Sequence, residues 1–317
     1  MPAGAREHPD PMESAPTPVV VGVDGSPESR EAARLGAVEA RARATRVVLL
    51  LVLPPAGRRR SREDELTVDR AVRVAAGLLL DGIAEDVARH VPEVPVSTHV
   101  LEGRPADVLA EAGRTAALLV VGSRSTGGIG DVVLGSTAID LVRAAPCPVL
   151  VVPLRPGSAV YGRRGVVVGV AGAPGDHDVL SFAFAEAAAR STEVVAVHTW
   201  RHPFPGPGHL ALDPFVGEPA ARRREEDVLA DALETCAVAA EGIVVRRVVE
   251  REQPATALVA ASLTADLLVV GHHHRAAGLL GSVTAAVVHR AACPVAVVPL
   301  RVPASRTPVD LSPAARS

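Results

Sequence analysis

The chain carries one sequence pattern twice. The segment VVVGVDGSP at 19–27 returns as VVVGVAGAP at 166–174, and CPVLVVPLR at 147–155 returns as CPVAVVPLR at 293–301. The pentapeptide LLVVG occurs once in each copy, between these two segments. Repeats that keep the same order indicate a duplicated domain. The 317 residues therefore divide into two halves of ordinary domain size, which is roughly 100–200 residues.

Each copy alternates short apolar runs with segments typical of helices. A short apolar run bounded by turn residues predicts a buried strand. After the first run, Ser26-Pro27-Glu28 supplies an N-cap, a proline and an acid that open a helix. In the first copy we expect strands at 19–23, 47–53, 94–100, 118–121 and 149–152. We expect four helices: one at 26–44, a long one that ends at residue 90, one that begins at residue 105, and one at 135–144. This order predicts an α/β fold: two tandem doubly wound, Rossmann-like domains, each a five-stranded parallel sheet with helices on both faces.

Aliphatic side chains must build the core. Hydrophobic residues make up 48% of the chain but aromatic residues only 2%, a composition typical of parallel sheets covered by helices on both faces. The long second helix carries apolar residues at helical spacing, which we expect to face the core. They are Leu66, Val72, Leu79, Ile83 and Val87.

Composition also divides the chain along its length. In order, we expect a disordered tail at 1–17, domain one at 18–155, a linker at 156–164, domain two at 165–301 and a disordered tail at 302–317. Within the second domain, the segment 200–221 is rich in Pro and Gly and is predicted to be a loop.

Charge and cysteine content exclude several classes of function. The net charge of −3 and the pI near 6.4 disfavour a nucleic-acid partner, which needs clustered cations. None of the 33 basic residues is Lys, which excludes P-loop and Schiff-base chemistry. Three cysteines make no disulfide framework, and no apolar run approaches the ~18 residues of a membrane span. A cytoplasmic protein without membrane contact is expected.

A glycine-rich loop is the strongest chemical signal. After the fourth strand, residues 122–137 read GSRSTGGIGDVVLGST and end where a helix is predicted to begin. Backbone N–H groups without side chains in the way, together with a helix N-terminus, bind anions such as phosphate. The loop lacks the Gly-Lys-Ser/Thr of a Walker motif, and the dinucleotide fingerprint follows a first strand instead. The loop therefore predicts a binding site for a chain of phosphates that belongs to neither of these two classes.

With these features the chain resembles the universal stress protein family, in its tandem two-domain actinobacterial form. The matching segments are VVGVDGS at 20–26, the loop above, APCPVLVVP at 145–153 and ACPVAVVP at 292–299. The resemblance implies the strand order 3-2-1-4-5 and antiparallel pairing of the two fifth strands, 149–152 and 295–298. It also implies binding of ATP or another adenine nucleotide, with or without Mg²⁺.

The family's ATP signature is Gly, two residues, Gly, nine residues, Gly, then Ser or Thr. The first copy keeps this spacing but has Ser125 in place of the second glycine. By position, the resemblance assigns the strand ends and Asp24 to the adenosine side, the first loop residues to the ribose and first phosphate, and the helix start to the outer phosphates. The residues assigned to the nucleotide are Val23, Asp24, Val52, Val121, Gly122, Arg124, Ser125, Gly135, Ser136 and Thr137.

The second copy departs from this signature. Six residues replace the nine between His274 and Gly281, His274 replaces the second glycine, and Ala171 replaces Asp24. A degenerate second site is therefore expected.

Simpler roles remain open for several of these residues. Asp24 could only cap a turn, the glycine-rich loop could be a plain connection, and His198 could be a core histidine bonded to backbone. The histidines at 272–274 point in different directions, which disfavours a metal site. Cys147 and Cys293 are expected to be inert packing residues.

Taken together, these observations favour a stress-response regulatory protein that binds an adenine nucleotide in domain one and acts as a switch or sensor, with slow ATP hydrolysis at most. A ligand-free protein-interaction scaffold is the alternative. An ATP-pyrophosphatase or nucleotidyl transferase is disfavoured because neither a Ser-Gly-Gly-x-Asp-Ser nor a His-x-Gly-His motif occurs near strand one. No catalytic or metal-binding residue is assigned, and association of two chains into a homodimer is left open.

Overall fold

A computed structural model describes residues 17–55, 62–123, 135–153, 165–200, 218–273 and 280–300. In the first copy the elements are β1 (Val19–Gly22), α1 (Pro27–Ala42), β2 (Val47–Leu53), α2 (Arg62–His90), β3 (Val96–Glu102), α3 (Pro105–Ala112), β4 (Leu118–Gly122), α4 (Ser136–Ala144) and β5 (Val149–Val152). In the second copy they are β6 (Val166–Val170), α5 (Asp176–Arg190), β7 (Val194–Thr199), α6 (Glu218–Glu234), β8 (Val245–Glu250), α7 (Pro254–Ala261), β9 (Leu267–His273), α8 (Ser282–Arg290) and β10 (Val295–Leu300). The α/β prediction is confirmed.

In the first copy the boundaries differ from the prediction by at most two residues. The third strand begins at Val96 instead of residue 94, because the chain is still turning at Val94, whose N–H donates to the Val91 carbonyl at 3.2 Å. Helix α6 begins at Glu218, so the end of the expected loop at 200–221 is helical. Residues 201–217 of that loop, the predicted linker, residues 1–16 of the first predicted tail and the whole of the second lie outside the described residues.

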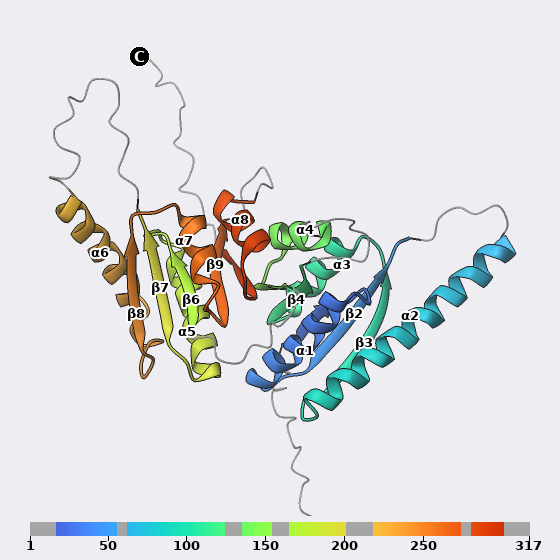
Figure 1. The fold of residues 1–317 in the computed structure, drawn as a ribbon. Helices are drawn as coiled ribbons and strands as arrows, with labels where there is room; N and C mark the ends of the chain where they lie inside the picture. Colours follow the sequence, from blue (N-terminus) through green and yellow to red (C-terminus); the bar gives the residue numbers. More distant parts are fainter. Residues whose placement is uncertain are drawn as a thin grey trace, which may run out of the picture.

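The strands form one ten-stranded sheet in the order β3-β2-β1-β4-β5-β10-β9-β6-β7-β8 (Figure 1). Each half follows the order 3-2-1-4-5 and is parallel throughout. The halves meet where β5 pairs antiparallel with β10, with Leu150 opposite Ala296. The second half is thus related to the first by an approximate two-fold axis that passes between β5 and β10.

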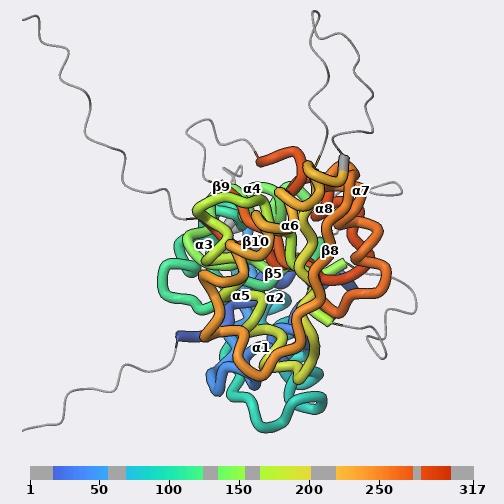
Figure 2. Tube along the Cα trace, turned by 90° about the vertical axis from the view of Figure 1, so that its left-hand side faces the viewer, coloured from blue at the N-terminus to red at the C-terminus, as the bar shows by residue number. Residues whose placement is uncertain are grey.

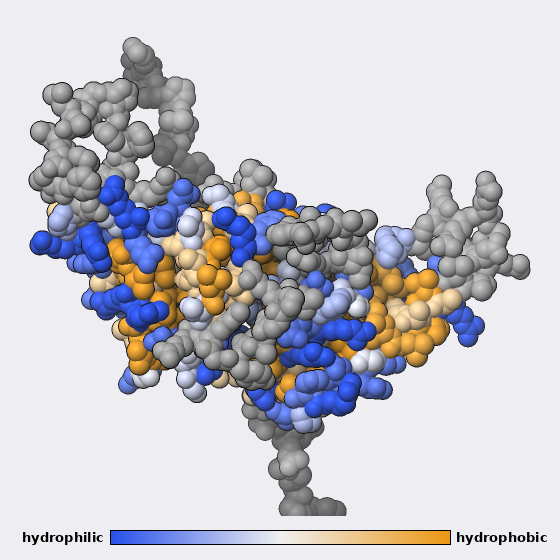
Figure 3. Space-filling view, viewed as in Figure 1, coloured by the Kyte–Doolittle hydropathy of each residue, from blue (hydrophilic) through white to orange (hydrophobic). Residues whose placement is uncertain are grey.

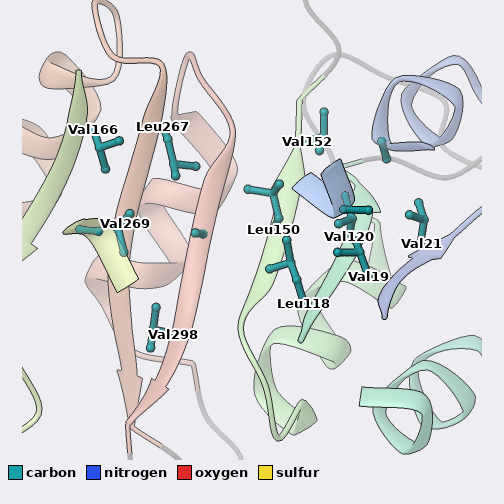
Figure 4. Packing of buried hydrophobic residues seen from close by; sticks show 14 of the residues in the cluster. Val19, Val21, Leu118, Val120, Leu150, Val152, Val166, Leu267, Val269 and Val298 are labelled. Carbon is teal, nitrogen blue, oxygen red and sulfur yellow. The ribbon is translucent and has the colours of Figure 1, made fainter. Parts of the chain in front are cut away.

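Helices cover both faces of the sheet. Because side chains alternate along a strand, Val19 and Val21 enter one core with α1, α2, α5 and α6, whereas Val20 enters the other with α3, α4, α7 and α8. Figure 2 shows α1 and α5 on one side of the sheet and α4 and α8 on the other. Both cores contain residues of the two copies. Figure 4 shows side chains of the first of them, from Val19 across to Val298.

Helix α2 is longer than the strands it covers. At ~1.5 Å per residue its 29 residues span roughly 43 Å, whereas a strand of seven residues spans roughly 23 Å. Ile83 and Val87 are buried as predicted, and Leu79 packs against the core. Val72 is 43% exposed, which contradicts its expected place in the core, because this part of α2 runs past the edge of the sheet. Figure 3 shows the apolar surface that results on the outer part of α2.

A ring of four charged side chains joins the copies between α1 and α5. Arg43 binds Glu39 on its own helix and Glu186 on α5, and Arg190 binds Glu186 on its own helix and Glu39 on α1. The carboxylates are only 2% and 3% exposed. Burial is the main cause that raises the pKa of Glu186, and the neighbouring Glu39 adds to it.

Among the described residues, no helix is both long enough and apolar enough to cross a bilayer.

Candidate functional site

A cavity of about 270 Å³ opens at the carboxyl ends of β1, β2 and β4 in the first copy. In an open α/β sheet this is where ligands bind, at the point where the strand order reverses, here between β1 and β4. One end of the cavity is apolar and is formed by β2 and α3, and the other is formed by β4 and the start of α4. The lining residues are Gly22, Val23, Asp24, Ser29, Leu50, Val52, Pro105, Leu109, Val121, Gly122, Gly135, Thr137 and Ala138.

Asp24 is held by the turn between β1 and α1. Its Oδ1 accepts hydrogen bonds from the Ser26 hydroxyl at 2.6 Å and from the Ser26 N–H at 3.0 Å. Ser26 in turn is the N-cap of α1, and its hydroxyl accepts from the Ser29 N–H at 3.2 Å. Asp24 is therefore not the cap itself. It orients the residue that caps, and it remains exposed at the cavity wall.

Gly122 lets the two walls of the cavity approach each other. A Cβ at this position would lie 2.8 Å from the Glu28 Cβ and 2.9 Å from the Glu28 carbonyl carbon. Those atoms belong to the first turn of α1, and a backbone cannot move aside as a flexible side chain does. The glycine is therefore required by the close approach of β4 to α1.

The start of α4 has no side-chain cap. Its N-cap, Gly135, has no side chain to accept a hydrogen bond, and the Gly135 carbonyl accepts from the Ala138 N–H at 3.1 Å. The Gly135 N–H itself donates to the Ser123 carbonyl at 2.8 Å, which brings the two ends of the glycine-rich loop together. Gly135 and Thr137 both line the cavity. The positive end of the helix dipole is thus directed at the same space as the end of β4.

The structure brings most of the predicted residues together. Val23, Asp24, Val52, Val121, Gly122, Gly135 and Thr137 line the one cavity. Ser136 does not, because its side chain is exposed to solvent at the first residue of α4. Arg124 and Ser125 lie outside the described residues.

Five side chains of the cavity were not predicted from the sequence, and one of them, Ala138, follows the predicted Thr137 on α4. Leu50 lies two residues before Val52 and so faces the same way from β2. Pro105 and Leu109 lie one turn apart at the start of α3, and Ser29 lies in the first turn of α1. Strand alternation could have indicated Leu50, whereas the contributions of α1 and α3 depend on how these helices cross the sheet.

The family model of the universal stress protein family matches residues 16–153 and again residues 162–299. The chain belongs to the universal stress protein family. The universal stress protein Rv1996 of Mycobacterium tuberculosis is 32% identical over 301 residues, covering 88% of this chain and 94% of that protein. A universal stress protein of Mycolicibacterium smegmatis is 33% identical over 295 residues, with 88% and 96% covered.

Among solved structures, a universal stress protein from Archaeoglobus fulgidus superposes with a TM-score of 0.64 at 16% identity, covering 90% of this chain and 98% of that one. This similarity shows the fold. The tandem universal stress protein architecture is therefore shared along nearly the whole length of the chain.

The second universal stress protein domain fills the equivalent crevice with its own atoms. Asp176 occupies the position of Ser29, and its carboxylate accepts hydrogen bonds from the N–H groups of Ala171, Gly172 and Ala173 at 2.7–3.1 Å. In the first domain the corresponding turn carries the Asp24 carboxylate instead. The N–H groups of the second turn are therefore already bonded, and a buried carboxylate lies where the first domain has a hydroxyl.

Leu300 closes the same crevice from β10. Its Cδ1 lies 2.9 Å from the place of a Cβ on Gly175 and 3.0 Å from that on Gly271, the counterpart of Gly122. An apolar side chain therefore packs between the end of β9 and the turn before α5. Together with Ala171 in place of Asp24, this packing fits the degenerate site expected from the sequence, although His274 lies outside the described residues.

His198, at the end of β7, is a bonded core side chain. Its Nδ1 lies 2.9 Å from the Val170 carbonyl oxygen and its Nε2 lies 2.9 Å from a carboxylate oxygen of Glu225 on α6. The expected backbone bond is present, and the Glu225 contact is additional. Among the described residues, no three His, Cys, Asp or Glu side chains are grouped so that they could hold a metal ion.

Proposed function

We propose that this universal stress protein is a stress-response regulator that binds ATP or another adenine nucleotide in its first domain and acts as a nucleotide-dependent switch. The observation that supports this most is the cavity that joins an apolar end to the N-terminus of α4, which has no side-chain cap. An adenine ring is flat and apolar, whereas its phosphates are anionic, so a ligand of this kind matches both ends.

Particular residues would hold each part of the nucleotide. Leu50, Val52 and Leu109 offer an apolar surface for the base. The exposed carboxylate of Asp24 would accept hydrogen bonds from ribose hydroxyls, which are donors. The phosphates would lie at Gly122 and at the start of α4, where Gly135 and Thr137 line the cavity.

The second domain would take no nucleotide in this proposal. The carboxylate of Asp176 repels phosphate, and its three N–H partners are not available to a ligand. Leu300 occupies the crevice beside Gly271. One nucleotide per chain is therefore expected, and the two domains would differ in occupancy.

Phosphoryl-transfer enzymes commonly use a lysine to neutralise the transferring phosphate. This chain contains no lysine. The role proposed is therefore that of a sensor, in which occupancy of the first domain sets a conformation or an interaction with a partner.

Isothermal titration of the full chain with ATP tests this proposal. The wild type should bind one ATP per chain. Gly135→Trp, which fills the cavity at the start of α4, should weaken binding at least tenfold. Gly281→Trp is the matched control because it makes the same change at the start of α8, and it should bind as the wild type does. Thermal melts of all three proteins verify folding.

Equal, weak heats from the three proteins would contradict the proposal and favour the ligand-free scaffold. Binding of two ATP per chain would contradict the asymmetry between the domains. Loss of binding in Gly281→Trp alone would place the site in the second domain and so contradict the proposal.

A further inference from the structure

A cysteine and a histidine form a close pair in the second domain, away from the nucleotide crevice of the first. The Cys236 Sγ lies 3.3 Å from the Nδ1 of His177. Cys236 follows the end of α6, and His177 is the second residue of α5. Fifty-nine positions separate them in sequence, so only the packing of the two helices brings them together.

Other polar groups surround the same sulfur. The hydroxyl oxygens of Ser181 and Thr235 each lie 3.6 Å from it. The Thr235 hydroxyl already donates to the Ala232 carbonyl at 2.6 Å, whereas the Ser181 hydroxyl can donate to the sulfur. The first turn of α5 adds the positive end of a helix dipole. The thiol can also donate to the His177 carbonyl oxygen at 3.7 Å. A histidine and a hydroxyl donor beside a sulfur are features of reactive cysteines.

A cavity borders the histidine of this pair. Its volume is about 300 Å³, and His177, Ala232 and Thr235 are among its lining residues together with Asp231. Cys236 does not line it and is 3% exposed, but its Sγ contacts His177 and Thr235, which do. His177 is exposed, so it lies between solvent and the sulfur.

All three cysteines are buried in core clusters, Cys236 in the cluster with α5 and α6 and the other two in the cluster on the opposite face of the sheet. Cys147 lies in the apolar core beside α4, and burial raises the pKa of its thiol to about 11. Cys293 is fully buried in the same core cluster. The chain therefore contains its own internal controls for thiol reactivity.

We propose that Cys236 is a peroxide-reactive thiol whose proton is taken by His177. The His177 Nδ1 accepts the Sγ proton, and the thiolate attacks one oxygen of hydrogen peroxide. An S–O bond forms as the O–O bond breaks, so sulfur loses two electrons and becomes a sulfenic acid. The leaving hydroxide takes the proton from the imidazolium as water, which restores His177 and leaves one water per peroxide.

The experiment treats the reduced full chain with hydrogen peroxide at pH 7.4, traps sulfenic acid with dimedone, and follows each cysteine by peptide mass spectrometry. Cys236 should be labelled at least tenfold faster than Cys147 and Cys293 in the folded protein. In urea the three rates should converge, because the difference arises from the fold.

Variants of His177 distinguish a histidine that takes the proton of the Cys236 thiol from one that only shields the sulfur. His177→Gln keeps a side chain of similar size over the sulfur but cannot take its proton at this pH, so Cys236 labelling should slow at least tenfold. His177→Ala should slow it too, whereas a histidine that only shields the sulfur would give faster labelling when removed. His289→Gln, on the exposed face of α8, is the matched control and should match the wild type.

The proposal is overturned if Cys236 reacts no faster than Cys147 in the folded chain. It is also overturned if His177→Gln leaves the rate unchanged or raises it.

Discussion

The buried ring between α1 and α5 makes a quantitative prediction about how the two domains are held together. Arg190→Met removes two of its four ion pairs and leaves Glu39 and Glu186 with Arg43 alone. Breaking a buried pair from one side costs about 3–5 kcal/mol because the remaining charge stays buried. The arginines are 22% and 23% exposed, so we take the lower value, about 3 kcal/mol of unfolding free energy.

The loss should depend on pH. The pKa of Glu186 is raised in the folded chain, chiefly by burial, while Arg190 and Arg43 lower it. The folded state therefore keeps this proton to a higher pH than the unfolded state, and the contribution of Glu186 to stability is present at low pH and declines as pH rises above its unfolded value. Arg190→Met removes one of the opposing cations, so its penalty should be larger at pH 8 than at pH 5.

Urea unfolding of the wild type, Arg190→Met and the double variant Glu186→Leu with Arg190→Leu measures the effect. The double variant removes the two charges that α5 contributes to the ring and leaves Glu39 paired with Arg43. Because an apolar pair often replaces a buried ion pair without loss, it should lie within about 1 kcal/mol of the wild type. An Arg190→Met protein as stable as the wild type, or a double variant less stable than the single one, would refute this reasoning.

Three further predictions concern stability. Gly82→Ala in α2, where nothing lies within 4 Å of the added Cβ, should raise the unfolding free energy by about 0.5–1 kcal/mol in urea, whereas Gly122→Ala should lower it because the added Cβ meets the backbone of Glu28. Ser26→Ala should cost about 1 kcal/mol through loss of the α1 cap, and Ser282→Ala, at an exposed first residue of α8, should change the melting temperature little. Folded Cys147 keeps its proton to a pH of about 11 against 9.0 for an unperturbed thiol, so stability should fall between these pH values by up to about 3 kcal/mol. Cys147→Ala should lose that slope, and an unchanged pH profile in this variant would show that another group causes it.

Sequence reasoning located the strands and the order of elements because both depend on local pattern. Buried parallel strands read as continuous runs of Val and Leu, and Ser26 with Pro27 defines the start of α1 as predicted. The same local reasoning failed for Val72, since helical spacing says which residues share a face but not where the sheet beneath them ends. The ring of Glu39, Arg43, Glu186 and Arg190 was not foreseen, because its bonds join residues 143 and 151 positions apart and form only when the two copies pack together.

The crevices of the two copies differ, although the two copies share the same fold and the same ring residues. In the aligned sequence repeats Glu39 corresponds to Glu186 and Arg43 to Arg190. The interdomain ring therefore uses the same residues from each copy, as an interface near an approximate two-fold axis requires. At the crevice no such symmetry is needed, because each copy closes its own site. There the N–H groups of Asp24 and Ser26 in the first copy donate to the Ser29 hydroxyl and to the Asp24 carboxylate, which stays exposed, whereas the second copy bonds the corresponding N–H groups to the buried Asp176. The Asp176 carboxylate thus bonds the turn of its own copy and stabilises that turn without any ligand. We therefore expect the second domain to keep its stability when ATP is removed, and the first domain to gain stability when ATP is added.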